Sequence, residues 1–370
     1  MPARVSIDVR ERGGDERTGR HFVDIASFGS VSRADSTPHE PANPMGDTFD
    51  RVDTLRDDPR DDIPMAHRMQ RFVEALQIRI VKKLESFEGD TSFRLDNWER
   101  DGGGGGLTAV IENGDVWEKG GVNTSAVHGD LPDRMVEAFG VEKKPFFATG
   151  LSLVIHPRNP HVPTVHANFR YFALGDDLMN PDDQWFGGGA DLTPYYPHLE
   201  DARHFHRVWK EVCDRHDAVA DYDAFKTECD DYFYLPHREE ARGVGGIFYD
   251  YLRDDPEGTF FFSREAGRRF LRSYVPIVER RLGTDYGERE RHFQLVRRGR
   301  YVEFNLLFDR GTKFGIETRG RTESILMSLP PHVEWRYDYT PEAGTPESRA
   351  MWFLTPRDWL DLDESDVPEG

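Results

Sequence analysis

The stretch WFGGGADLTPY, from Trp185 to Tyr195, combines three consecutive glycines with aromatic residues and one carboxylate, Asp191. Glycines let a backbone approach a ligand closely because they carry no side chain. Aromatics and a carboxylate suit a flat organic ligand with a polar centre better than a linker, which would be rich in glycine and serine. The residues alone leave a second interpretation open, a tight corner of a sheet.

Two segments upstream of this run carry polar side chains at alternate positions. Because successive side chains of a strand point to opposite faces, His166, Asn168 and Arg170 are expected on one face. The same rule puts Ser152 and His156 on one face of the preceding segment. If both faces line one cleft, they supply two imidazoles, a hydroxyl, an amide and a guanidinium. The alternative is a polar strand face that is simply solvated.

The elements that would position these residues follow from periodicity. Apolar residues at three- and four-residue spacing predict a helix that begins near Pro64. Further helices are expected over 200–217, 223–233 and 263–282, and a flexible glycine loop over 101–106. Strands are expected over 108–111, 151–155, 165–174, 293–297, 302–308 and 313–317, the last three joined by Arg-Gly turns. Strands and helices that come in separate blocks predict an α+β fold with a mostly antiparallel sheet.

Several motifs recur in one order along the chain. They are GLSLVIHP at 150–157, HANFR at 166–170, HFHR at 204–207, YFYLPHR at 232–238, YGERER at 286–291, RRGRYVEFN at 297–305 and GRTESILMS at 320–328. Together with the glycine run, they closely resemble the oxygen-dependent coproporphyrinogen III oxidases. The resemblance extends from about Met65 to about Trp359.

This resemblance implies a large, mostly antiparallel sheet covered by helices on both faces, in a homodimer. It implies the substrate coproporphyrinogen III, a tetrapyrrole with four propionates. Two propionates would be oxidatively decarboxylated to vinyl groups, which gives protoporphyrinogen IX. Molecular oxygen would be the co-substrate and electron acceptor, with release of carbon dioxide and hydrogen peroxide and without an organic cofactor.

Catalytic roles are also implied by the resemblance. The family's proton-donor role falls on His166, and Asp191 is the best candidate to hold or deprotonate the pyrrole N–H groups. His156, His166, His206 and His237 match histidines that have been interpreted in some members as a divalent-metal set. Their spacing matches no compact metal motif, and His206 flanks the apolar stripe of its helix, where a structural histidine is equally expected.

The propionates require cations, and arginine suits this task because its guanidinium binds carboxylates in a bidentate manner. Arg310, next to Asp309, matches a family motif and is expected to take part in catalysis, although a hairpin turn with a salt bridge is an alternative. The family's Gly-x-Arg substrate segment aligns with Arg319, Gly320 and Arg321. Substrate-binding roles are also expected for Ser152, Asn168, Arg170 and Asp309, and more weakly for Arg238 and Arg242.

The composition limits the classes of partner. The 370 residues include 68 acidic and 48 basic side chains, a net charge of −20. Such a surface disfavours nucleic acid and anionic membranes. Paired aspartates suggest adaptation to a salty cytoplasm, and an ordinary acidic protein is the alternative. Two cysteines, Cys213 and Cys229, cannot hold an iron–sulfur cluster by themselves, which excludes the radical route to the same product.

The chain has no apolar run of 18 residues, so no membrane span is expected. Its first residues mix acids and bases, unlike a signal or transit peptide, and we expect a cytoplasmic protein. Residues 1–62 are polar and aperiodic, which predicts a disordered extension. Residues 63–370 are then the catalytic domain.

Two other functions are compatible with the same residues. The first is a metal-dependent hydrolase or dioxygenase that uses the histidines. The second is a tetrapyrrole carrier that binds without turnover. Metal stoichiometry and turnover of the porphyrinogen distinguish these possibilities.

Overall fold

Seven strands form one sheet with the order β1-β2-β3-β4-β5-β6-β9, and every neighbouring pair is antiparallel. The computed structural model describes residues 63–369 apart from 141, 143 and 318–320, so the predicted extension over 1–62 lies outside the described residues. The strands are β1 (Arg94–Glu99), β2 (Gly104–Glu112), β3 (Trp117–Asp130), β4 (Pro145–Pro157), β5 (Thr164–Leu174), β6 (Asp183–Thr193) and β9 (Gly245–Leu252).

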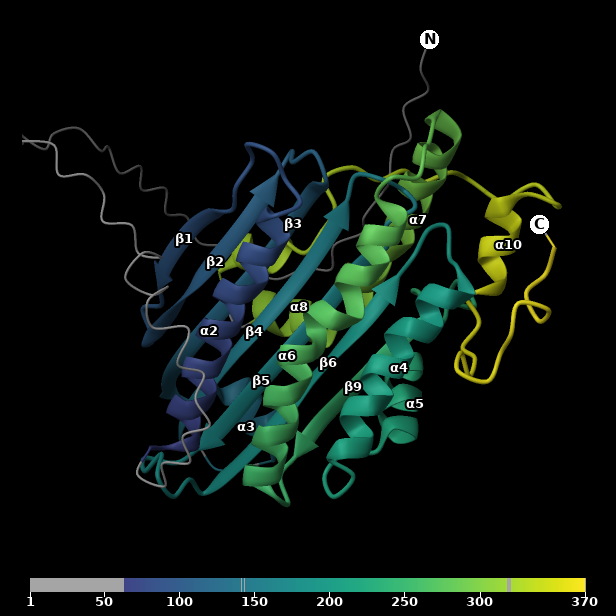
Figure 1. The fold of residues 1–370 in the computed structure, drawn as a ribbon. Helices are drawn as coiled ribbons and strands as arrows, with labels where there is room; N and C mark the ends of the chain where they lie inside the picture. The colour runs from purple at the N-terminus through teal and green to yellow at the C-terminus, as the bar shows by residue number, and fades with distance from the viewer. Residues whose placement is uncertain (1–62, 141, 143, 318–320, 370) are drawn as a thin grey trace, which may run out of the picture. The chain divides into compact units, whose positions relative to one another are not determined.

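One face of this sheet is apolar and is covered by three helices, α2 (Met65–Glu85), α4 (Leu199–Arg215) and α6 (Pro256–Arg281), as Figure 1 shows. Alternate residues of β4 and β5, among them Leu153 and Phe169, are fully buried against them. The predicted helix near Pro64 is therefore confirmed as α2, and its apolar stripe packs on this core. A smaller helix, α5 (Tyr222–Tyr232), packs on the edge strand β9.

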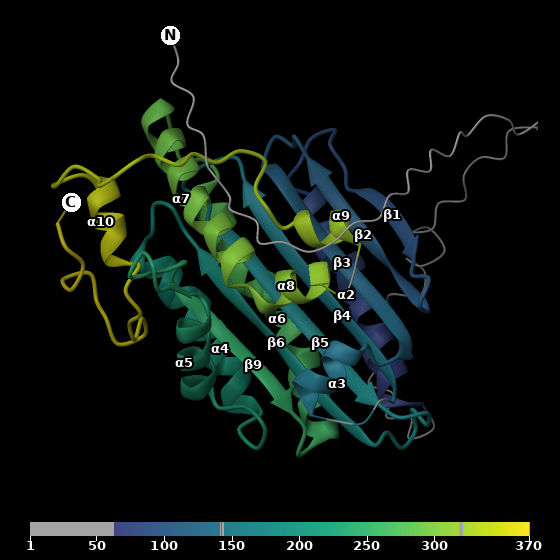
Figure 2. The same ribbon diagram turned by 180° about the vertical axis from the view of Figure 1, so that it is seen from behind.

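The second face carries the polar positions of β4 and β5. Figure 2 shows it covered by α3 (Asp133–Phe139), α7 (Glu288–Leu307), α8 (Arg310–Glu317) and α9 (Thr322–Leu326). Contacts from α9 fix this layer, since Ser324 Oγ bonds Thr108 Oγ1 at 2.8 Å and Asn123 Nδ2 donates to the Ser324 carbonyl at 2.9 Å. The expected antiparallel sheet with helices on both faces is thus confirmed.

The C-terminal third differs from the expectation of strands over 293–297, 302–308 and 313–317. Those residues lie in helices α7 and α8. Phe293, Val296, Tyr301 and Phe304 are buried at three-, five- and three-residue spacing, which matches one side of a helix but not alternation. The strand prediction was wrong because it took Arg-Gly pairs for turns, and Gly299 lies inside α7.

Glycine runs mark strands here rather than loops. The expected loop over 101–106 is a turn only over 101–103, and Gly104–Glu112 is strand β2. Likewise, residues 187–189 lie inside β6, where all three pair with β5 and the last two also pair with β9. Glycine in a strand permits close approach by a neighbouring group, and composition alone could not separate this use from a flexible loop.

The excess of acidic residues predicts a response to salt. With a net charge of −20, self-repulsion destabilises the folded state at low ionic strength. The Debye length falls from about 10 Å at 0.1 M to about 3 Å at 1 M, so sodium chloride should raise the melting temperature over this range. Thermal denaturation across that series checks this, and a flat or falling melting temperature would contradict adaptation to salt.

Candidate functional site

The polar face of the sheet brings His166 and Asp191 together. They are directly opposed in the β5–β6 register, and the His166 Nδ1–H donates to Asp191 Oδ1 at 2.7 Å. Two residues further along β5, Asn168 lies opposite Ser152 of β4. The prediction that these side chains share one face is therefore confirmed, and that face extends over β4, β5 and β6. The His166 side chain is 20% exposed, so its ring is the accessible part of the pair.

A buried arginine completes this pair. Arg242, which lies between β8 (Glu240–Ala241) and β9, donates from Nη2 to Asp191 Oδ2 at 2.7 Å and from Nη1 to Asn305 Oδ1 at 3.0 Å. Its guanidinium carbon lies 4.0 Å from the ring centre of Phe233 and 4.6 Å from that of Tyr301. Both partners of the ion pair are almost fully buried.

This arrangement sets the charge of Asp191. Burial by itself raises the pKa of the Asp191 carboxyl, but the charge of Arg242 and the hydrogen bond from His166 outweigh it, and the pKa is lowered. Asp191 is therefore a carboxylate at neutral pH. It holds the His166 ring by its Nδ1–H, which leaves Nε2 available for proton exchange with a ligand.

A second cation lies further along the same face. Arg170 donates to Asn168 Oδ1 at 3.1 Å and forms an ion pair with Asp250 on β9 at 2.8 Å. A Cβ atom at Gly187 would lie 2.7 Å from both Arg170 Nε and Asp250 Oδ1. The first glycine of the run therefore makes room for this ion pair, and any side chain there would displace it.

Arg310 is positioned by an aromatic pair at the β9 edge. Its guanidinium lies 4.7 Å from the Tyr232 ring centre and 5.7 Å from that of Phe248, and the two rings stack at 4.4 Å. The Tyr232 hydroxyl donates to Asp309 Oδ1 at 2.8 Å and accepts from the Arg310 N–H at 3.1 Å. Within the described part of the chain, no carboxylate lies within ion-pair distance of Arg310.

The alternative of a hairpin turn at Arg310 does not hold for this described segment, because Arg310 is the first residue of α8. Arg321 precedes α9 and donates from Nη2 to Asp96 Oδ2 on β1. Since β1 and β9 are opposite edges of the sheet, about 29 Å apart for seven strands, the two arginines do not form one clamp. Arg319 and Gly320 lie outside the described residues.

Among the described residues, the four histidines of the expected metal set do not come together as a metal-binding group. His156 is fully buried, with Nδ1 bonded to Thr164 Oγ1 at 3.2 Å and Nε2 to the Ser328 carbonyl at 2.8 Å. His206 is buried on α4, beyond the opposite face of the sheet, where it bonds Tyr222 and the Val244 carbonyl. Burial lowers the pKa of His206 to about 3.

His237 contacts a different element, because its Nε2–H donates to Glu303 Oε2 of α7 at 2.8 Å. Among the described residues, no three histidine, cysteine, aspartate or glutamate side chains are close enough to hold a metal ion. The residues present therefore do not fit the four-histidine metal site. His156 and His206 are structural, with both ring nitrogens engaged.

Glu303 predicts a measurable pH effect. Burial opposes ionisation, but hydrogen bonds from Arg238 and His237 lower the pKa of Glu303 to about 2. A carboxyl with a lowered folded-state pKa stabilises the fold above about pH 4.5, and this contribution is lost as the pH falls towards 2.

Between pH 6 and pH 3, we expect the unfolding free energy of wild type to fall by about 1–2 kcal/mol more than that of Glu303→Gln. Denaturant titrations of both proteins at the two pH values check this. Equal decreases of the unfolding free energy in the two proteins would show that Arg238 and His237 do not lower the pKa of Glu303.

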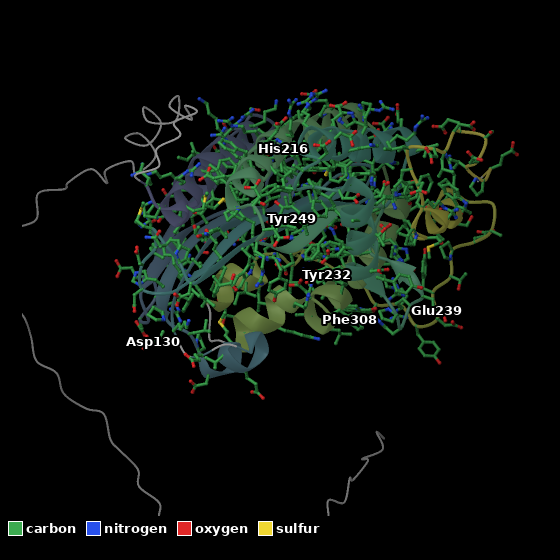
Figure 3. All side chains as sticks on the ribbon, turned by 90° about the horizontal axis from the view of Figure 1, so that it is seen from below. Asp130, His216, Tyr232, Glu239, Tyr249 and Phe308 are labelled. Atoms are coloured by element: carbon green, nitrogen blue, oxygen red, sulfur yellow. The ribbon has the colours of Figure 1, made fainter. Side chains whose placement is uncertain are left out.

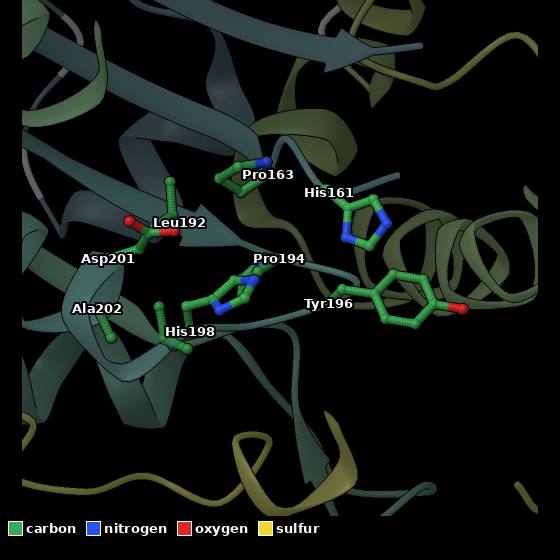
Figure 4. Close-up of a pocket in the computed structure, with 9 residues that line it drawn as sticks. His161, Pro163, Leu192, Pro194, Tyr196, His198, Asp201 and Ala202 are labelled. Carbon is green, nitrogen blue, oxygen red and sulfur yellow. The ribbon is translucent and has the colours of Figure 1, made fainter. Parts of the chain in front are cut away.

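A small pocket at the end of β6 lies away from these residues. Figure 4 shows His161, Tyr196 and His198 around it, with Asp201 on the α4 side. Burial lowers the pKa of His198 to about 4, and the Tyr196 hydroxyl donates to Glu347 Oε1 at 2.6 Å. Tyr196 thus links the pocket to α10 (Pro346–Trp352) of the C-terminal segment.

Sequence reasoning gave Arg242 only a weak role and gave none to Tyr232 or Asp250. Tyr232 is the first residue of the motif YFYLPHR, and Asp250 lies in a strand next to predicted residues. The only sequence signal for Tyr232 was its position in that motif, because local spacing predicts neither the burial of a side chain nor its hydrogen-bond partner.

A buried carboxylate held between a histidine and an arginine, on a sheet face with further arginines, is an arrangement suited to an enzyme site for an anionic ligand. Comparison with known proteins specifies the enzyme. A family model described as coproporphyrinogen III oxidase matches residues 68–359. The chain belongs to the coproporphyrinogen III oxidase family, whose members are oxidoreductases of porphyrin biosynthesis.

Three curated relatives, each named oxygen-dependent coproporphyrinogen-III oxidase, are similar over most of their length. The protein of Synechococcus sp. (strain CC9902) is 50% identical over 323 residues, which cover 79% of this chain and 87% of the relative. That of Prochlorococcus marinus (strain MIT 9313) is 50% identical, with 80% and 90% covered. That of Coxiella burnetii (strain RSA 331 / Henzerling II) is 52% identical over 295 residues, with 79% and 94% covered.

Proposed function

We propose that this protein converts coproporphyrinogen III to protoporphyrinogen IX with molecular oxygen as electron acceptor. Each of two propionate side chains, CH2CH2COO−, reacts with one O2 and one proton to give a vinyl group, CO2 and H2O2. The C–COO bond breaks, the adjacent carbon loses a hydrogen, and two electrons pass to oxygen. Family membership supports the reaction, and the His166–Asp191–Arg242 chain supports its location on the polar sheet face.

His166 and Asp191 act as a unit in this proposal. The Asp191 carboxylate accepts from His166 and from Arg242, yet a carboxylate has about four lone-pair sites, so it retains the capacity to accept a pyrrole N–H. His166 Nε2 exchanges the proton that the decarboxylation requires. Arg242 keeps Asp191 ionised and acts as a positioning residue.

Arginines hold the propionates. Arg170 and Arg310 both lie 5.7 Å from the ring centre of Phe248, so two guanidinium groups flank one aromatic ring at the same end of the face. Arg321 would bind a different propionate, in competition with Asp96. Further substrate-binding roles are proposed for Ser152, Asn168, Asp309, Arg319 and Gly320.

The decisive experiment is aerobic incubation with coproporphyrinogen III while product formation and oxygen uptake are followed, with and without a chelator. We expect two O2 consumed per protoporphyrinogen formed, in the presence of chelator as well as in its absence. Tight binding without turnover would instead indicate a carrier. Activity that a chelator abolishes and a divalent metal restores would indicate a metal-dependent enzyme.

We also infer that residues 63–370 form the catalytic domain, and that the protein is a cytoplasmic homodimer without an organic cofactor. Family resemblance supports the dimer. In the described part of the chain, no helix is long and apolar enough to cross a membrane. Light scattering of the purified protein tests the dimer.

Tyr232 gives a prediction for the Arg310 end of the site. Tyr232→Phe keeps the ring beneath the Arg310 guanidinium but removes the hydroxyl that joins Asp309 to the Arg310 N–H. One neutral-to-charged hydrogen bond contributes about 1.5–3 kcal/mol, so we expect kcat/KM to fall by about 10-fold or more. Steady-state kinetics checks this, with Tyr222→Phe as a matched control in the same helix. Equal efficiencies for wild type and Tyr232→Phe would remove Tyr232 from the site.

A further inference from the structure

The helical layer on the apolar face is positively charged, although the chain as a whole is strongly acidic. Helices α2, α4 and α6 contain fifteen arginines and lysines against nine aspartates and glutamates, in a chain with a net charge of −20. Figure 3 looks along the sheet, with His216 on the side of this layer and Tyr232 and Phe308 on the other side, and nitrogen tips crowd the layer's outer surface. This excess of positive charge favours the approach of anions to this face.

A pocket on this outer surface concentrates the positive charge. It is lined by four basic side chains and one acidic side chain from α4 and α6, namely Glu200, Arg203, His204, Arg207 and Arg280. The four α4 residues follow one another at three, one and three positions, which places them on one side of the helix. The pocket is built by side chains of the first three turns of α4 and by Arg280 of α6.

The negative charge in the pocket is already compensated. Glu200 is bound by Arg281, which lies outside the lining. Arg280 donates from Nε and Nη2 to Asp201 Oδ1 at 3.0 and 2.7 Å, and three of its five N–H groups remain. The carboxylates nearest the pocket thus have their own arginine partners, and they do not neutralise its other cations.

Two guanidinium groups of the described residues form no ion pair, although the charge of Arg203 acts on the Asp363 carboxyl. Among the described residues, no carboxylate lies within ion-pair distance of Arg203 or Arg207, and the buried Nε of Arg203 has no hydrogen-bond partner. Arg207 is exposed. His204 is held at the pocket wall by a 3.0 Å hydrogen bond from Nε2 to the Arg272 carbonyl. The pocket therefore carries two guanidinium groups that form no ion pair with a carboxylate of the described residues.

We propose that this pocket is a binding site for a doubly charged oxyanion of the phosphate type, held by Arg203, Arg207 and Arg280. Planar guanidinium groups match such an oxyanion because each offers parallel N–H donors to two oxygens. The site lies on the opposite side of the sheet from His166 and Asp191, and it is independent of the proposed oxidase reaction. The phosphate could belong to a soluble compound or to a lipid headgroup.

The test is calorimetric titration of the full chain with inorganic phosphate, at low and constant ionic strength set with sodium chloride. We expect one phosphate per chain, with binding weakened about 10-fold or more in both Arg203→Ala and Arg207→Ala, as for loss of a charge-assisted hydrogen bond. Arg269→Ala removes the same charge from the same layer but outside the pocket, and it should bind like wild type. Because Arg207 is exposed, Arg207→Ala should fold normally and keep full oxidase activity.

Vesicles distinguish the two sources of phosphate. If phosphatidylglycerol vesicles bind wild type but not Arg207→Ala, and free phosphate competes with them, the ligand is a headgroup. If only free phosphate binds, it is a soluble compound. The proposal is overturned if phosphate gives no more heat than chloride. It is also overturned if Arg207→Ala binds phosphate as tightly as the control Arg269→Ala and wild type do.

Discussion

Asp191→Asn is expected to lower turnover by at least about 10²-fold, the scale for loss of a positioned acid–base group. The amide has the size of the carboxylate but only one acceptor oxygen, while His166 and Arg242 both donate to Asp191. One donor must therefore lose its partner, and the buried charge of Arg242 is left uncompensated. Breaking a buried ion pair on one side costs about 3–5 kcal/mol, so the unfolding free energy should fall as well.

Turnover and stability must be separated in this experiment. Asp201→Asn is the matched control, because Asp201 is also a buried carboxylate bound by arginines, Arg280 and Arg281, but lies in α4 on the other layer. We expect that variant to lose stability while its folded fraction keeps normal turnover. Circular dichroism and steady-state kinetics on both variants provide the comparison. Near-normal turnover in folded Asp191→Asn would remove Asp191 from the mechanism.

Arg310→Ala should reduce kcat/KM by about 10- to 150-fold with the fold intact. Its guanidinium is placed by the stacked rings of Tyr232 and Phe248 and has no carboxylate partner among the described residues, so it is available to a propionate. A charge-assisted hydrogen bond contributes about 1.5–3 kcal/mol, which corresponds to this range. Arg310→Lys keeps the charge but loses the planar fork, and it should lie between wild type and alanine.

The effect at Arg321 should be smaller. Arg321 is already bound to Asp96, so a substrate carboxylate would have to compete with that pair. We expect Arg321→Ala to impair catalysis more than Arg321→Lys, and both less than Arg310→Ala. Arg215→Ala, on the outer helical layer, is a control for loss of one positive charge. If Arg310→Ala keeps wild-type efficiency, the propionates are held elsewhere on the sheet.

The local sequence pattern was sufficient to predict helices and strands, whose geometry repeats every few residues. Alternation over residues 165–174 predicted the shared face of His166, Asn168 and Arg170, because a strand reverses side-chain direction at every residue. Three- and four-residue spacing likewise predicted α2 and α4. The same reasoning failed over 293–317, where arginine and glycine within α7 and α8 resembled turns and concealed the helical spacing of the buried aromatics.

The amino-acid sequence by itself determined the family, the sheet-and-helix class and the polar face that carries His166 and Asp191. Only the tertiary structure decided what each group bonds. Arg242 lies 51 positions from Asp191, and Tyr232 lies 77 from Asp309. Such pairs depend on strand order, register and burial, which arise from packing of the whole chain and have no local periodicity. For the same reason, only the structure could show that His206 lies on the other side of the sheet from His156 and His166, although each belongs to a family motif.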